Sequence, residues 1–159
     1  MGERARILIV DDDETIRKVL KTILSEKGYS VDTAECGEEA IAKTNQTFYN
    51  MVLVDMRLPD MEGTKLLTAI KETTPKMVKI IITGYPSLQN AIEAVNKNAD
   101  AYVLKPVDMD KLLQIIQENL EKQAIAKKQA ESKITEFIEM RVKEIEQNPP
   151  KAAVDDKRK

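Results

Sequence analysis

Histidine is absent from this chain of 159 residues. Its absence excludes a histidine general base, a zinc site built on histidine and a phosphohistidine on the chain itself. Cys36 is the only cysteine, which excludes an intrachain disulfide and a cysteine metal centre. The chemistry of this protein must therefore use carboxylates, lysine, threonine or serine.

Long apolar runs are missing as well. No stretch approaches the roughly 20 apolar residues that span a bilayer, and the apolar run near the start is too short for a signal peptide. The net charge of -2 creates no global field that favours nucleic acid or an anionic membrane. We therefore expect a cytoplasmic protein that makes no direct contact with nucleic acid and does not insert into a membrane.

Short apolar runs alternate with amphipathic stretches through most of the chain. The predicted strands are 6–10, 29–34, 51–54, 78–82 and 101–104, and the predicted helices are 15–27, 37–45, 63–72, 86–96 and one that begins at 109. This alternation indicates parallel strands joined by right-handed crossovers, with helices on both faces of the sheet. The predicted fold is α/β, a doubly wound (βα)5 flavodoxin-like sandwich with strand order 2-1-3-4-5.

Polar side chains follow the ends of four of these strands. They are Asp11 and Asp12 after the first strand, Asp55 after the third, Thr83 after the fourth and Lys105 after the fifth. In the predicted strand order all of these ends lie on one rim of the sheet, where open α/β sheets place their sites. A single aspartate after a strand is explained by a turn or a helix cap, whereas their joint placement on one rim indicates a functional site.

Three carboxylates on one rim repel one another, and a divalent cation is the usual remedy. Oxygen ligands without histidine or cysteine suit Mg²⁺. Asp55 can then act as a nucleophile and form an acyl phosphate. The ammonium of Lys105 can neutralise the phosphoryl oxygens, and the hydroxyl of Thr83 can donate to one of them.

The sequence closely resembles the receiver domain of two-component response regulators, over about residues 5 to 120. The matching motifs, in family order and at family-like spacing, are Asp11-Asp12-Asp13-Glu14, Asp55-Met56-Arg57-Leu58-Pro59-Asp60-Met61-Glu62-Gly63, Thr83-Gly84-Tyr85 and Asp100-Ala101-Tyr102-Val103-Leu104-Lys105-Pro106. The resemblance implies that Asp55 is the phosphoacceptor. It also implies that Asp12 binds Mg²⁺ directly and Asp11 through water, with Asp55 and the backbone carbonyl of Arg57 as further ligands.

The resemblance assigns roles to three more residues. Thr83 and Tyr102 correspond to the switch pair, Lys105 to the phosphate-binding lysine, and the Lys105-Pro106 peptide bond is expected to be cis. Arg57 and Tyr85 lie two residues after the acceptor and after Thr83. Because large side chains there can obstruct the hydrolytic water, we expect a long-lived phosphorylated form.

The function implied is a signalling switch and not an enzyme, since it catalyses only its own phosphotransfer and dephosphorylation. The phosphoryl group would come from a sensor histidine kinase or a histidine phosphotransfer protein. Phosphorylation would change the face made by the fourth helix, the fifth strand and the fifth helix. An unknown downstream protein, or a second copy of the chain, would bind there.

Two alternatives stay open. Asp11-Asp12-Asp13-Glu14-Thr15 also fits Asp-x-Asp-x-Thr, which resembles the nucleophile motif of haloacid-dehalogenase-type Mg²⁺ phosphohydrolases, with Asp11 as the nucleophile. That reading leaves Asp55 unexplained. The other alternative is a receiver-like scaffold that binds its partners without phosphate.

The sequence divides into three segments, and the last two lie in the C-terminal part of the chain. We expect a receiver domain at 1–120, a helical extension at 121–147 and a disordered tail at 148–159. Ile134, Phe137, Ile138 and Ile145 form a helical stripe in the extension. The stripe indicates a dimerisation or partner-binding helix, and the alternative is a solvated helical extension.

Overall fold

In the computed structural model, which describes residues 4–150, five strands alternate with five helices. The strands are β1 (Arg6–Val10), β2 (Ser30–Ala34), β3 (Met51–Asp55), β4 (Val78–Thr83) and β5 (Ala101–Leu104). The helices are α1 (Glu14–Glu26), α2 (Gly37–Gln46), α3 (Gly63–Ala69), α4 (Leu88–Asn96) and α5 (Met109–Gln147).

All strand pairs in the sheet are parallel, and the strand order is β2-β1-β3-β4-β5. Val10 at the end of β1 pairs with Val54, and Asp55 pairs with Ile82 on β4. The register therefore brings the carboxyl ends of β1, β3 and β4 to one edge, and β5 joins them through its pairing with β4. The predicted doubly wound fold and strand order are confirmed.

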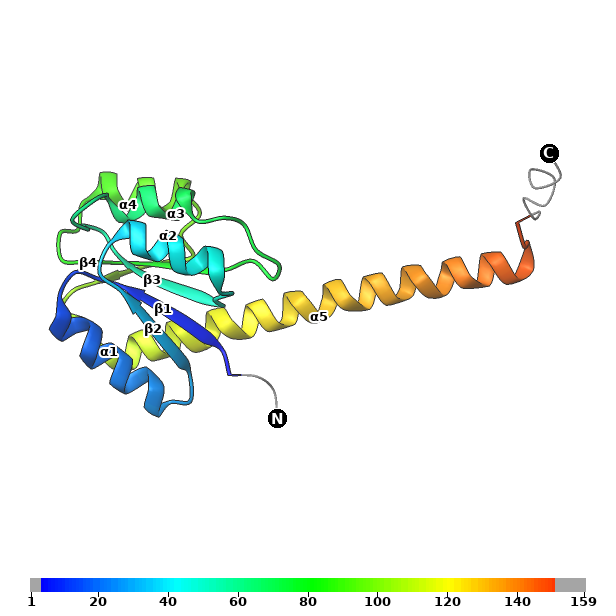
Figure 1. Cartoon of the computed structure of the whole chain (residues 1–159), viewed down its shortest axis with the longest axis horizontal. Helices are drawn as coiled ribbons and strands as arrows, with labels where there is room; N and C mark the ends of the chain where they lie inside the picture. The colour runs from blue at the N-terminus through cyan, green and yellow to red at the C-terminus, as the bar shows by residue number, and fades with distance from the viewer. Residues whose placement is uncertain (1–3, 151–159) are drawn as a thin grey trace. The chain divides into compact units, whose positions relative to one another are not determined.

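Helices cover both faces of the sheet (Figure 1). One apolar layer packs α1 and the first turns of α5 against the sheet, and the other packs α2, α3 and α4 against the opposite face. Because β3 is buried on both faces, its residues 51–54 form an unbroken apolar run with at most 1% exposure. Asp55, the last residue of β3, is the first polar residue of the strand and the first that is only partly buried.

The helix α1 begins at Glu14, one residue before the predicted start. The carboxylate of Asp13 accepts hydrogen bonds from the backbone amides of Thr15 (2.9 Å) and Ile16 (3.3 Å), as an N-cap does. Gly28 follows the helix with φ +97°, a left-handed conformation that glycine adopts without strain. The cap by Asp13 fixes the start of α1 beside the loop that carries Asp11 and Asp12.

Two predicted helix boundaries are wrong. The helix expected at 63–72 ends at Ala69, because Ile70 turns to an extended backbone and is buried. The buried ammonium of Lys79 donates to the carbonyl of Leu67 (2.9 Å) and satisfies this helix end. The helix expected to start at Pro86 starts at Leu88, since the Ser87 hydroxyl accepts from the amide of Asn90 (3.0 Å) and caps it.

The helix α5 continues without interruption to Gln147, while the compact unit that contains the sheet ends at Gln123. The second unit, which begins at Ala124, is described separately below. Residues 151–159 of the predicted disordered tail lie outside the described residues. Within residues 4–150 no helix has the length and apolarity that crossing a membrane requires.

Candidate functional site

Three aspartates meet at the carboxyl edge of the sheet. Asp11, Asp12 and Asp55 each offer a carboxylate oxygen, and these oxygens lie within 4.8 Å of one another. Asp11 is buried, Asp55 is half-buried and Asp12 is exposed. The pairing of β1 with β3 produces this cluster from residues more than 40 positions apart in the sequence.

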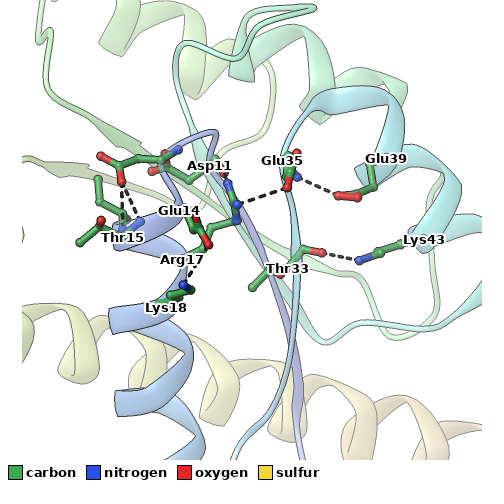
Figure 2. Close-up of polar contacts among 11 residues, drawn as sticks. Asp11, Glu14, Thr15, Arg17, Lys18, Thr33, Glu35, Glu39 and Lys43 are labelled. Atoms are coloured by element: carbon green, nitrogen blue, oxygen red, sulfur yellow. Dashed lines mark hydrogen bonds and ion pairs between the residues drawn. The ribbon is translucent and has the colours of Figure 1, made fainter.

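Asp11 is held from several sides. Its carboxylate accepts from the backbone amide of Asp13 (2.9 Å) and from the ammonium of Lys105 (3.1 Å). Its carbonyl accepts from the guanidinium of Arg17 (2.7 Å), which also pairs with Glu35 (3.3 Å), so that Arg17 links α1 to the loop after β2 (Figure 2). The sequence analysis does not identify Arg17 as a site residue. The one feature of the sequence that points to it is its position as a cation in the first turns of the helix that follows Asp11 and Asp12.

Lys105 brings a positive charge to the rim. Its ammonium lies 3.1 Å from a carboxylate oxygen of Asp11 and 3.4 Å from one of Asp55, and 22% of its side chain is exposed. Its backbone amide donates to the carbonyl of Thr83 (2.8 Å), and its peptide bond to Pro106 is cis. Burial lowers the pKa of the Lys105 ammonium, but the carboxylates of Asp11 and Asp55 together raise that pKa above its ordinary value.

The carboxylate of Asp55 has a raised pKa. Burial is the largest cause, the charge of Asp11 adds to it, and Lys105 and the backbone amide of Arg57 oppose it. Lys105 pairs with two of the three carboxylates, Asp11 and Asp55, so negative charge remains in excess on this rim. Because the donors are oxygen atoms only, the cluster fits a hard divalent cation such as Mg²⁺.

Thr83 and Tyr102 stand on neighbouring strands behind the carboxylates. Thr83 is fully buried at the end of β4, and its hydroxyl oxygen accepts from the backbone amide of Tyr85 (3.0 Å). Tyr102 on β5 packs against the apolar layer under α2, α3 and α4. Its hydroxyl is buried without a hydrogen-bond partner among the described residues, an arrangement that costs free energy as long as it persists.

Arg57 and Tyr85 lie together at the mouth of the site. The guanidinium carbon of Arg57 lies 4.1 Å from the centroid of the Tyr85 ring, in a cation–π contact. Arg57 is exposed, and 61% of Tyr85 is exposed. The two positions expected to flank a phosphoryl group on Asp55 are thus in contact with each other.

Fold and site together define a signalling-type α/β domain with an acidic pocket and a neutralising lysine at the strand ends. The family model of the response regulator receiver domain matches residues 7–117, and the chain belongs to this family. The chain accordingly contains the receiver domain of a two-component response regulator, and members of this family generally act as switches.

Solved structures support the same assignment. A CheY-like receiver domain from Methanospirillum hungatei is 46% identical with a TM-score of 0.74, and the match covers 78% of this chain and 99% of that one. The beryllofluoride-activated NtrC4 receiver domain dimer is 36% identical with a TM-score of 0.70, covering 74% of this chain and 98% of that one.

Among curated proteins, the transcriptional regulatory protein GlrR of Escherichia coli is 38% identical over 122 residues, and ZraR of Klebsiella oxytoca is 37% identical over 119 residues. These matches cover 77% and 75% of this chain but only 28% and 27% of the relatives. The chain therefore spans about a quarter of the length of these regulators. The match gives no support to the phosphohydrolase alternative.

Proposed function

We propose that this chain is a phosphorylation-controlled switch whose acceptor is Asp55. The observation that carries the proposal is the ammonium of Lys105, which lies within 3.4 Å of both Asp11 and Asp55. A receiver needs a cation that can move from its own carboxylates to an incoming phosphoryl group, and this geometry supplies one. The donor would be a phosphohistidine on a sensor kinase or a histidine phosphotransfer protein, since the chain has no histidine of its own.

In the proposed reaction a carboxylate oxygen of Asp55 attacks phosphorus, the P–N bond to the donor imidazole breaks, and an acyl phosphate forms. The ammonium of Lys105 then pairs with a phosphoryl oxygen. A cation held by Asp11, Asp12, Asp55 and the backbone carbonyl of Arg57 would offset the charge of the phosphoryl oxygens, and we propose Mg²⁺ in that role.

The hydroxyl of Thr83 provides the link to the rest of the domain. When Thr83 moves so that its hydroxyl donates to a phosphoryl oxygen, the hydroxyl oxygen leaves the amide of Tyr85, from which it accepts before phosphorylation. The space behind it changes next to Tyr102, whose hydroxyl has no hydrogen-bond partner among residues 4–150. We infer that these two residues pass the charge change to the face of α4, β5 and α5.

Apolar side chains on that face support a partner-binding role. Leu88 and Val95 on α4 are 79% and 70% exposed, and Leu104 on β5 is 51% exposed. The partner would be an unknown downstream protein or a second copy of this chain. Similarity to a beryllofluoride-activated receiver dimer supports the second copy as one occupant.

A separate apolar pocket lies beside Lys105, with a volume of about 330 Å³. It is lined by Thr15, Ile16, Val19, Leu20, Lys105, Pro106, Val107 and Met109. Because it borders the rim and exposes Val19 on α1, we propose that the phosphodonor docks there.

We further propose a cytoplasmic location and a receiver domain at 1–120 that precedes the helical extension.

Intact mass after incubation with acetyl phosphate and Mg²⁺ tests this function. We expect a gain of about 80 Da in the parent chain and none in Asp55→Asn. Asp60→Asn, a change of the same kind outside the cluster of Asp11, Asp12 and Asp55, should keep the gain. A gain that survives Asp55→Asn and disappears in Asp11→Asn would instead support the hydrolase-type nucleophile. No gain in any folded variant would support the scaffold that binds partners without phosphate.

A further inference from the structure

The second unit of the chain carries a row of apolar side chains that the part of the chain described by the structure leaves exposed. Every residue of α5 from Ala124 onward is exposed. The row consists of Ile134, Phe137, Ile138, Val142 and Ile145, and the exposures of Ile134 and Phe137 are 59% and 70%.

These side chains share one side of the helix. At about 100° per residue, Ile134, Ile138 and Ile145 project within roughly 40° of one another. Met140 and Ile125 are also apolar and exposed, but they project to the other side. Arg141 lies between the members of the row and pairs only with Glu144 of its own helix (3.1 Å) among the described residues.

The charges of this unit are unevenly distributed along the helix. Residues 124–133 hold three lysines and one glutamate, a net charge of +2, whereas residues 134–147 hold four glutamates, one arginine and one lysine, a net charge of -2. The last turn of α5 contains no basic residue. Negative charge at a helix C-terminus opposes the helix dipole, so this distribution does not serve the isolated helix.

We propose that residues 124–147 pair in antiparallel orientation with the same helix of a second copy of this chain. An antiparallel partner places the +2 half of one helix against the -2 half of the other and supplies cations to the acidic C-terminal end. A parallel pair in register would instead place Arg141 against its own copy in the middle of the apolar row. Like charges in that position are unfavourable.

The antiparallel arrangement also buries the middle of the apolar row against apolar residues of the second copy. With Ile134 of one helix opposite Ile138 of the other, Ala130 lies opposite Val142 and Arg141 lies opposite Glu131 of the second copy. The inference goes beyond the proposed function, since it involves neither Asp55 nor its phosphate. Its failure would leave the phosphorylation proposal untouched.

Sedimentation velocity of the unphosphorylated full chain, across a range of concentrations, is the first test. We expect a monomer–dimer equilibrium that Ile138→Glu weakens by about tenfold or more, because two buried isoleucines are lost per dimer. Met140→Glu is the matched control: Met140 is just as exposed but lies off the row, so its substitution should change the dissociation constant little. Circular dichroism should show that both variants keep the parent's helix content.

The orientation is tested with one nitroxide label at Ile125→Cys, in a chain whose Cys36 is replaced by Ser. In the antiparallel pair two such labels lie about 30 Å apart or more along the helix axis, because the rise is about 1.5 Å per residue. In a parallel pair they would lie within about 20 Å, given helix axes about 10 Å apart. A short distance, a monomer at all concentrations, or a dimer that Ile138→Glu leaves intact would each overturn the proposal.

Discussion

At the scale of single residues, Gly63 at the start of α3 lies against the end of β3, which carries the proposed phosphoacceptor Asp55. A Cβ atom at Gly63 would lie 2.5 Å from the carbonyl oxygen of Asp55 and 3.1 Å from the Cα of Met56. The amide of Gly63 donates to the carbonyl of Met56 (2.6 Å), which holds the two segments together. Because the atoms it would meet are backbone atoms, they cannot rotate away.

We predict that Gly63→Ala lowers the free energy of unfolding by about 1–3 kcal/mol through overpacking. It should also slow the phosphorylation of Asp55, whose backbone must shift. Gly84→Ala is the control, since the nearest atoms to a Cβ there belong to Lys105 at 3.7 Å or more. Urea denaturation measures both effects on stability, and equal losses in the two variants would contradict the steric argument.

The stack of Arg57 on Tyr85 bears on the lifetime of the phosphate. If the stack has to open before water reaches the acyl phosphate, it adds about 0.5–1 kcal/mol to the barrier. We predict that Arg57→Ala and Tyr85→Ala each speed loss of phosphate about two- to fivefold. The double variant should lose phosphate no faster than the faster of the two single variants, because either substitution removes the contact.

Intact mass followed over time after removal of the phosphodonor gives these rates. Lys65→Ala, an exposed cation on α3 away from the mouth of the site, serves as the control. Additive effects in the double variant would show that the two side chains act separately. An unchanged rate in all variants would contradict an obstructing role for the stack.

At the scale of an element, α2 depends on a cap from elsewhere in the chain. Its own N-cap residue, Cys36, makes no capping hydrogen bond from its side chain. The carboxylate of Asp60, in the loop after β3, accepts from the amides of Gly37 and Glu38, both at 2.9 Å. Those two amides, with Glu38 the larger contributor, lower the pKa of the Asp60 carboxyl.

A lowered carboxyl pKa implies stability that is present above the unfolded-state pKa of about 3.9 and is lost as the pH falls through the folded-state value. We predict that Asp60→Asn reduces stability at pH 7 and that the difference from the parent chain shrinks below about pH 4. Thermal unfolding between pH 3 and pH 7 measures this. The exposed Glu72 gives a control variant, Glu72→Gln, and a difference for Asp60→Asn that did not depend on pH would contradict the capping role.

At the scale of the whole molecule, one side chain of α5 closes the end of the sheet opposite the candidate site. The amide nitrogen of Gln123 donates to the carbonyls of Asn50 (2.9 Å) and Lys76 (2.7 Å), and its oxygen accepts from the side chain of Asn50 (3.0 Å). The side-chain oxygen of Asn50 in turn accepts from the amide of Arg6 (2.9 Å). This network joins the starts of β1, β3 and β4 to the fifth helix.

We predict that a chain ending at residue 120 is less stable than one ending at residue 128 by about 1–3 kcal/mol, because two carbonyls lose their donor. Both chains should still accept phosphate, since the rim lies at the other edge of the sheet. In the full chain, Gln123→Ala should reproduce most of the loss, and Gln129→Ala, an exposed glutamine of the same helix, should not. Equal stability of the two shortened chains would refute the role of Gln123.

The sequence by itself determined the order of the helices and strands and which residues lie at the carboxyl edge of the sheet. Apolar runs of four to six residues and helical periodicity are local properties, and so are the capping positions of Asp13 and Asp108. Parallel alternation then brings the ends of β1, β3, β4 and β5 to one edge whatever the side chains between them. For that reason the sequence alone predicts that Asp11, Asp55, Thr83 and Lys105 lie near one another.

Tertiary structure alone decided the contacts that no spacing in the chain encodes. The cap that Asp60 supplies to α2, the hold of Arg17 on Asp11 and the bonds of Gln123 join residues on separate elements. The early end of α3 has the same origin, since a buried lysine from β4 satisfies its last turn. Such contacts depend on how helices and strands face one another after they pack, and the periodicity of the sequence does not encode that orientation.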